Sequence, residues 1–418
     1  MQNKKLHICI ITGEFPALTE TFITTKVLEL HKRGHRITVI KNQHSGAVNA
    51  SHLSLVKDAG IEVLSFIDIS SASNLLEAAI KNPGLLIKTL LVNARKFRKS
   101  YKANRQGELL QKHPYDIVHF EFSGLGVLYK DAISKIKSKT VVSCRGTAEK
   151  VKPISEPDRV EKLKRLFEVV DGIHCVSDDM AATIRPYCNN LQKIFVNRPS
   201  IDPAVFKRTK DYTRKSAKVT ILTIGRFTFQ KGYLIGLMAM KQLKAEGVDF
   251  LWKIVGDGPQ KEELLFHIHT LQLHDHVELL GKKNRDEILD LYNNVDLFLL
   301  PSVYEGIANV CLEAMSMQLP VVSTKSGGME EVIVHKQNGL LCEVYDAASI
   351  AANVKVVAED TEVSKTLGIS ARKTILERFT IQQQADVFEE QYAKIVRGST
   401  TNEEVLTYKA VNKLSTTL

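Results

Sequence analysis

The feature that most constrains the fold is a regular alternation of short, branched apolar runs with longer stretches of helical periodicity. Residues 5–11 form such a run, residues 25–33 have helical spacing, and residues 36–40 form the next run. Gly34 follows the helical stretch, where a left-handed residue commonly ends a helix. Strand–helix–strand units place their strands parallel and cover both faces of the sheet. We therefore predict an α/β fold.

The alternation occurs in two series, separated by an irregular segment. Residues 197–212 break the periodicity and contain Pro199 and Pro203, as linkers between domains do. At 418 residues, the chain has the length of two domains of about 200 residues each. Further strands of the first series are expected at 61–66, 116–120, 140–144, 172–176 and near 193–196. The second series predicts strands at 219–224, 250–255, 277–280, 295–300 and 321–323, with helices at 234–246, 261–271, 285–293, 347–358, 363–376 and 381–395.

Composition narrows the class of protein. Hydrophobic residues make up 44% and charged residues 25%, as in ordinary soluble enzymes, and no apolar run approaches the roughly 18 residues of a membrane span. The apolar start at 6–11 is stopped by Thr12, Gly13 and Glu14, so it is interpreted as a core strand and not a signal peptide. Six scattered cysteines without a C-x-x-C pair favour a reducing cytoplasm. The net charge of +10 suits phosphate-bearing ligands, an anionic membrane or nucleic acid, without choosing among them.

Residues 301–315 contain the most informative stretch. An apolar run ends at Pro301, Gly306 permits a bend, and helical spacing begins near residue 308. A helix start after a strand leaves backbone N–H groups free to hold a phosphate, here those of Ile307, Ala308 and Asn309. Glu305 lies before this helix and Glu313 lies inside it. The pair can grip hydroxyls on either side of a phosphate; the plainer interpretation is a capping Glu and a surface Glu.

A second candidate site follows the expected strand at 219–224. Gly225 and Arg226, and then Lys231, come directly after it. Open parallel sheets bind ligands beyond the carboxyl ends of their strands. Two cations on one such loop can converge on a pyrophosphate, whereas the alternative is a basic surface loop. Gly256 and Gly258 follow the strand at 250–255, but Lys261 stands where a dinucleotide fingerprint needs glycine.

A metal site is not expected. His267, His269, His274 and His276 are the only metal-like cluster, and the first two point to different faces of a helix. The chain has no Asp-x-Asp motif, so we expect no metal ion and no other cofactor at the site.

These motifs, in this order, resemble the signatures of retaining glycosyltransferases of the family 4 type, the group 1 glycosyltransferases. The resemblance rests on Glu305 with Glu313, on Arg226 with Lys231, on Gly256-Asp257-Gly258-Pro259, and on Gly327-Gly328 with Glu331. Gly13-Glu14-Phe15-Pro16 followed by Thr19-Glu20-Thr21-Phe22 is similar to a pattern of bacterial members that make capsule and other surface polysaccharides. The resemblance implies the GT-B fold, two Rossmann-like domains facing a cleft. It places an acceptor-side domain at 1–203, to which residues from about 381 to 418 return, and a nucleotide-sugar domain at 204–380.

The resemblance also implies roles for particular residues. Arg226 and Lys231 would steady the leaving diphosphate of a nucleoside-diphosphate sugar, Glu305 would bind the sugar ring and Glu313 the ribose. Lys283, beside Gly281, would contact the base, and the backbone at Gly13 would approach the donor from the first domain. Arg145 stands where many members have a His that contacts the donor sugar, so an anionic sugar or a phosphate-bearing acceptor is considered. Glu20 is left between a helix-dipole role and contact with the acceptor.

His119, at the end of the expected strand 116–120, is a candidate for the cleft, with a structural role as the alternative. Residues 81–113 hold nine Lys or Arg against the single acid Glu108. They predict either a basic amphipathic helix on anionic lipid at the inner face of the membrane or a helix with a solvated basic face.

The predicted activity is transfer of a sugar to a saccharide or lipid-linked acceptor in bacterial surface polysaccharide biosynthesis. A sugar-nucleotide 2-epimerase of the same fold is the enzyme alternative. A basic nucleic-acid-binding protein is the non-enzyme alternative, although no nucleic-acid-binding module is visible and nucleic acid is not expected as a partner.

Overall fold

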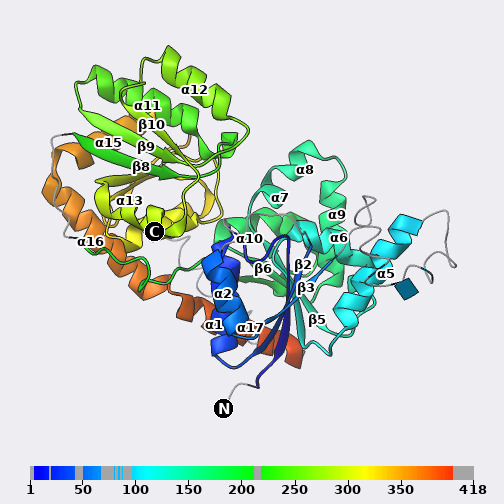
Figure 1. Cartoon of the computed structure of the whole chain (residues 1–418). Coiled ribbons are helices and arrows are strands. Elements are labelled where there is room, and N and C mark those ends of the chain that lie inside the picture. Colours follow the sequence, from blue (N-terminus) through cyan, green and yellow to red (C-terminus); the bar gives the residue numbers. More distant parts are fainter. Residues whose placement is uncertain are drawn as a thin grey trace, which may run out of the picture.

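Two parallel sheets with helices on both faces make up the structure, a computed structural model (Figure 1). It describes residues 4–17, 20–42, 50–66, 97–210 and 218–398, together with residues 80, 83, 84 and 87. The strands of the first sheet are β1 (His7–Thr12), β2 (Arg36–Lys41), β3 (Glu62–Ser65), β4 (Ile117–Phe120), β5 (Lys139–Cys144), β6 (Gly172–Cys175) and β7 (Ile194–Val196). Those of the second are β8 (Val219–Ile224), β9 (Phe250–Val255), β10 (Val277–Gly281), β11 (Leu297–Leu300), β12 (Val321–Thr324) and β13 (Leu340–Cys342).

Helices connect the strands in both halves. In the first half they are α1 (Thr21–Lys32), α2 (Ala50–Asp58), α5 (Phe97–Gln111), α6 (Ser123–Ile133), α7 (Thr147–Lys150), α8 (Lys152–Ser155), α9 (Arg159–Val169), α10 (Asp178–Ile184), η2 (Arg185–Tyr187) and η3 (Leu191–Lys193). In the second half they are η4 (Phe229–Lys231), α11 (Tyr233–Ala245), α12 (Lys261–Thr270), α13 (Arg285–Asn294), α14 (Asn309–Ser316), η5 (Gly327–Glu331), α15 (Ala347–Glu359), α16 (Thr361–Arg378) and α17 (Ile381–Arg397).

Each sheet reverses its strand order once. The first runs β3-β2-β1-β4-β5-β6-β7 and the second β10-β9-β8-β11-β12-β13. The connections leave β1 and β4, and likewise β8 and β11, on opposite sides of a crevice at their carboxyl ends, which is where such sheets bind ligands. The two switch points are therefore the places to look for a site.

The predicted fold class is confirmed, and every strand expected from the sequence is present, with ends shifted by a few residues. The omission of β13 was wrong: its three residues, Leu340 to Cys342, pair in parallel with β12 and lie buried at the end of the second sheet. Most of the basic segment 81–113 lies outside the described residues, except for residues 83, 84 and 87 and those from 97 onward, where α5 runs from Phe97 to Gln111.

The last described helix packs on the first half of the chain. Figure 1 shows the chain passing from α16, under the second sheet, to α17, under the first. Ala385, Phe388 and Tyr392 of α17 are buried in the cluster that holds Ile8 and Val27. Full burial of a side chain such as Phe388 contributes about 1.5–3 kcal/mol. We propose domain limits of 1–203 with the returning α17, and 204–380.

Backbone contact between neighbouring loops makes Gly232 a sensitive position. Its φ is +64°, and an added Cβ would lie 2.0 Å from the carbonyl oxygen of Pro301. Gly247 at the far end of α11 has a similar φ of +77°, with nothing within 4 Å of an added Cβ. We expect Gly247→Ala to lower the unfolding free energy by about 1 kcal/mol, from backbone strain alone.

Gly232→Ala should cost about 2 kcal/mol more, because the Pro301 carbonyl must also move. Urea unfolding of both variants beside the wild type measures the difference. Both substitutions reduce the freedom of the unfolded chain equally, so that contribution cancels. Equal losses would contradict the close contact.

Candidate active site

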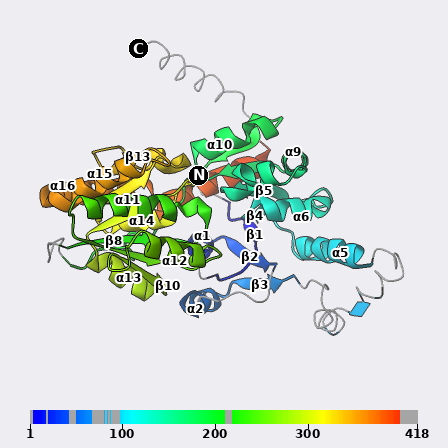
Figure 2. The same ribbon diagram turned by 90° about the horizontal axis from the view of Figure 1, so that it is seen from above.

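The loops at the two switch points face each other in contact. Thr147 and Tyr304 hydroxyls lie 3.1 Å apart across the boundary, and Glu331 Oε1 accepts from the Asp179 amide at 3.1 Å. An added Cβ on Gly306 would lie 2.8 Å from the carbonyl oxygen of Arg145. Figure 2 shows α10, which begins at Asp178, at the boundary between the halves. Residues of both halves therefore share one site.

An ion pair joins the two loops of the second switch point. Lys231 Nζ lies 2.6 Å from Glu305 Oε1, and the Ser302 hydroxyl donates to the same oxygen at 2.7 Å. Both charged side chains are largely enclosed, Lys231 being 18% and Glu305 8% exposed. Arg226 is exposed on the same loop as Lys231. The sequence therefore predicted the meeting of the two loops correctly, although it did not predict the Lys231–Glu305 pair.

Glycines allow the neighbouring backbones to touch. Gly256 has a φ of +152°, and an added Cβ would lie 1.9 Å from the carbonyl oxygen of Gly225. The Tyr233 hydroxyl donates to the same Gly225 oxygen at 2.8 Å, a contact that the sequence did not predict. Gly258 abuts Phe227 in the same way. Lys283 pairs with Glu287, in the first turn of α13, at 2.8 Å.

The start of α14 has no side-chain cap. The Ala308 amide donates only to the weak acceptor Met329 Sδ, at 3.4 Å, and the side-chain oxygen of Asn309 is buried without a partner. Ile307 is buried next to them. The start of this short helix thus lacks a side-chain cap and leaves the Ala308 amide with a weak acceptor, as expected from the strand–loop–helix pattern.

Glu313 has a partner that the sequence did not predict. The Tyr292 hydroxyl lies 3.0 Å from Glu313 Oε2 and also 3.0 Å from the Val310 carbonyl oxygen. Burial raises the pKa of Glu313 to about 7, while the Tyr292 hydrogen bond and the charge of Arg285 act against the rise. Tyr292 belongs to an ordinary amphipathic stripe on α13, so no signal in the sequence distinguishes it.

On the first-domain side of the site, Lys26 and Arg145 are held by the buried carboxylate of Glu121; we call these three residues the first-domain wall. The Glu121 carboxylate lies 2.6 Å from Lys26 Nζ through Oε1 and 2.5 Å from Arg145 Nη2 through Oε2. Burial alone would raise the pKa of Glu121, but the charges of Lys26 and Arg145 outweigh it and hold that pKa well below its usual range. Burial lowers the pKa of Lys26 to about 8. Arg145 also lies over the ring of Phe22, 4.4 Å from its centre.

His119 lies beneath this wall and not on the cleft surface. It is wholly buried; its Nδ1 lies 2.5 Å from the Tyr392 hydroxyl and 3.1 Å from Lys26 Nζ, and its Nε2 lies 2.7 Å from Ser143 Oγ. Because an ammonium can only donate, Nδ1 must accept, which places the ring proton on Nε2. The expectation that His119 points toward the cleft does not hold here. Gly13, at the end of β1, has open space where a Cβ would be added.

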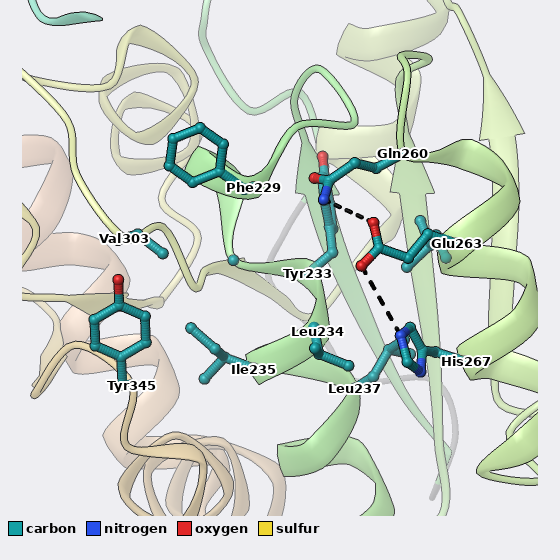
Figure 3. A pocket seen from close by; sticks show the side chains of 12 residues that line it. Phe229, Tyr233, Leu234, Ile235, Leu237, Gln260, Glu263, His267, Val303 and Tyr345 are labelled. Atoms are coloured by element: carbon teal, nitrogen blue, oxygen red, sulfur yellow. Dashed lines mark hydrogen bonds and ion pairs between the residues drawn. The ribbon is translucent and has the colours of Figure 1, made fainter. Parts of the chain in front are cut away.

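An apolar pocket of about 310 Å³ lies beside the Lys231 loop (Figure 3). Phe229, Leu234, Ile235 and Tyr345 line it, and a Glu263–His267 contact of 4.0 Å lies on its polar side. Among the described residues, no group of three or more His, Cys, Asp or Glu side chains is placed to hold a metal ion. None of the described helices has the length and apolar character to cross a membrane.

Comparison with known proteins finds similarity to one family in the second half of the chain. Residues 206–374 match the model of "Glycosyl transferases group 1". Over 231 residues the chain is 30% identical to the putative colanic acid biosynthesis glycosyltransferase WcaL of Salmonella typhimurium, covering 52% of this chain and 55% of that protein. It is 28% identical over 305 residues to the N-acetyl-alpha-D-glucosaminyl L-malate synthase of Bacillus anthracis, which covers 71% of this chain and 79% of that protein.

The chain thus spans about half the length of WcaL. Among solved structures, the Anabaena protein HepE in complex with UDP and glucose superposes with a TM-score of 0.71 at 18% identity, covering 92% of this chain and 98% of that one. At this identity the likeness concerns the fold, which is GT-B.

The raised pKa of Glu313 makes stability depend on pH. Between pH 4.5, the ordinary value, and about 7, the folded state holds a proton that the unfolded state releases. The unfolding free energy should therefore fall as pH rises through this window, by up to about 1.4 kcal/mol per unit. We expect Glu313→Gln to remove this share of the decline, measured by urea unfolding of variant and wild type from pH 4.5 to 7.5. Parallel curves for the two proteins would refute it.

Proposed function

We propose that this chain is a group 1 glycosyltransferase, which transfers a sugar from a nucleoside-diphosphate sugar to a hydroxyl of a saccharide or lipid-linked acceptor. The observation that carries the proposal is the meeting of Lys231 and Glu305, 2.6 Å apart, beside Arg226 and the uncapped start of α14. Cations and free amides thus gather at the switch point of the second sheet, opposite the wall of the first. We propose that transfer retains the configuration at the sugar and needs no metal ion.

Charge neutralisation of the leaving diphosphate is the main catalytic effect in this proposal. Arg226, Lys231 and the amides of residues 307–309 supply it in place of a cation. A contact between unit charges at about 4 Å contributes roughly 4 kcal/mol at an effective dielectric of 20, before desolvation is subtracted. Donors fixed before the reaction need no reorganisation as charge develops. The pair with Glu305 holds Lys231 in position before the donor binds.

The hydroxyls of the donor sugar and of the ribose are proposed to bind the carboxylates of Glu305 and Glu313. In the proposal Glu305 accepts from hydroxyls of the sugar ring and Glu313 from those of the ribose. Gly225, Gly256 and Gly258 allow close backbone approach at the nucleotide, and Lys283 serves the base. From the first domain, Gly13 and Arg145 contact the donor, and His119 acts as a support through Ser143 and Tyr392.

The proposed acceptor is taken from the biosynthetic process for which a relative is named. The relative WcaL is named for colanic acid biosynthesis, so a growing surface polysaccharide is the proposed acceptor class. HepE was solved with UDP and glucose, which makes UDP-glucose the first donor to try. A basic contact of residues 81–113 with anionic lipid would bring a cytoplasmic enzyme to a lipid-linked acceptor.

Release of nucleotide from a panel of UDP-, GDP- and ADP-sugars, with and without saccharide acceptors, tests the activity. Acceptor-dependent release with a new glycosidic product is expected. Epimerisation of the donor sugar, or nucleotide release that no acceptor accelerates and that yields no glycosidic product, would favour the 2-epimerase. Inertness toward the whole panel would overturn the proposal.

Arg226→Ala separates catalysis from folding, because this side chain is exposed. We expect turnover to fall about a hundredfold, as when one donor to a developing anion is lost, while the unfolding free energy changes by less than about 0.5 kcal/mol. Lys241→Ala, an exposed cation on α11 of the same domain, is the matched control and should change neither. A turnover equal to that of the control would remove Arg226 from the site.

Membrane contact has its own test. Replacing Lys96, Arg98, Lys99 and Lys102 by Gln should reduce co-flotation with phosphatidylglycerol vesicles and leave flotation with neutral vesicles unchanged. Undiminished binding to the anionic vesicles would rule this segment out as the basis of membrane contact.

A further inference from the structure

Glu20 occupies the N-cap position of α1 without capping it. Its side chain accepts no hydrogen bond from the first turn of the helix, although this is the ordinary role of a polar residue at that position. Asp360 occupies the same position on α16 and does accept, from the Val363 amide at 2.9 Å. The helix-dipole role that the sequence left open for Glu20 therefore lacks the contact that usually accompanies it.

The Glu20 carboxylate is also unsatisfied. Its Oε2 is shielded from solvent and has no hydrogen-bond partner, and among the described residues no other carboxylate oxygen is in this condition. Three buried carboxylates of the facing loops are held: Glu121 by Lys26 and Arg145, Glu149 by the amides of residues 145 and 146, and Glu305 by Lys231 and Ser302. A buried acceptor without a donor is costly, and such positions commonly await a ligand.

The surroundings of Glu20 place it at the junction of the two domains. It follows β1, and Glu121 follows β4, so both lie at the switch point of the first sheet. The charges of Arg145 in the first domain and Arg226 in the second both act on its carboxyl, and both oppose the rise in its pKa that burial causes. Arg145 lies over the ring of Phe22, two residues further along the chain.

The chemistry of a carboxylate selects the kind of ligand. It accepts hydrogen bonds and repels phosphate, so its partner is a hydroxyl and not the diphosphate. The donor hydroxyls are already assigned to Glu305 and Glu313 of the second domain. The guanidinium of Arg145 is already directed at Glu121, 2.5 Å away. A neutral acceptor hydroxyl fits this position.

We propose that Glu20 accepts a hydrogen bond from the attacking hydroxyl and orients it toward the sugar, whether that hydroxyl belongs to the acceptor or to a water molecule in its place. This inference rests on the proposed glycosyl transfer and adds a positioning residue for its acceptor.

Glu20→Gln tests the inference, with UDP-glucose as donor and octyl glucoside or water as acceptor. We expect the kcat/KM for octyl glucoside and the rate of UDP-glucose hydrolysis to fall about ten- to hundredfold, as for a lost hydrogen bond to a charged group. The affinity for UDP, measured by calorimetry, should stay within twofold, and the melting temperature should not fall.

Asp360→Ala is the matched control. Because Asp360 does cap its helix, its loss should lower the melting temperature by a few degrees and leave both rates unchanged. Wild-type rates in Glu20→Gln would overturn the inference while leaving the proposed glycosyl transfer intact. If the melting temperature of Glu20→Gln also fell as in the control, with both rates unchanged, Glu20 would have a structural role only. A wild-type enzyme that neither transfers nor hydrolyses any sugar of the donor panel would overturn the proposed function itself, and the inference with it.

Discussion

Parallel pairing of β8 with β11 is the constraint on which the site depends. These strands are neighbours in the sheet but lie far apart in the sequence, with Leu297 opposite Ile221. Their loops must therefore leave the same edge side by side, which brings Lys231 to Glu305 and the Pro301 carbonyl to Gly232. Only glycine tolerates that approach with its positive φ. The chemistry proposed for the loops follows from this one pairing.

A chain of buried hydrogen bonds is the second constraint, and it positions the first-domain wall. Lys26 donates to His119 Nδ1, so His119 donates to Ser143, Ser143 to His174 Nδ1, and His174 to the carbonyl oxygen of Asn197. Every member of this chain of hydrogen bonds is buried, and one arrangement of protons satisfies all of them. Such a network is stiff because a break anywhere leaves a polar group unpaired in the interior. It fixes Glu121, and through Glu121 the direction of Arg145.

The sequence allowed the sheets and the meeting of the Lys231 and Glu305 loops to be predicted, because branched apolar runs mark buried strands and strand ends share an edge. It did not allow β13 to be predicted, since three residues carry too little periodicity. His119 was misjudged because alternation along a strand does not say which face a later helix will cover; here Tyr392 covers it. Glu121, by contrast, could have been found. It follows β4 directly, in the same relation to its strand as Gly225 and Arg226 to β8.

The return of α17 to the first sheet has a consequence for biosynthesis. Phe388 and Tyr392 complete a core whose other members, such as Ile8 and Val27, leave the ribosome more than three hundred residues earlier. Until residues 381–397 emerge, the first Rossmann-like unit exposes an apolar face in the crowded cell, where nascent chains aggregate. Its final closure therefore waits until the strands of the second sheet have been synthesised. A nonsense mutation between residues 204 and 380 would therefore also damage the part of the protein that is made first.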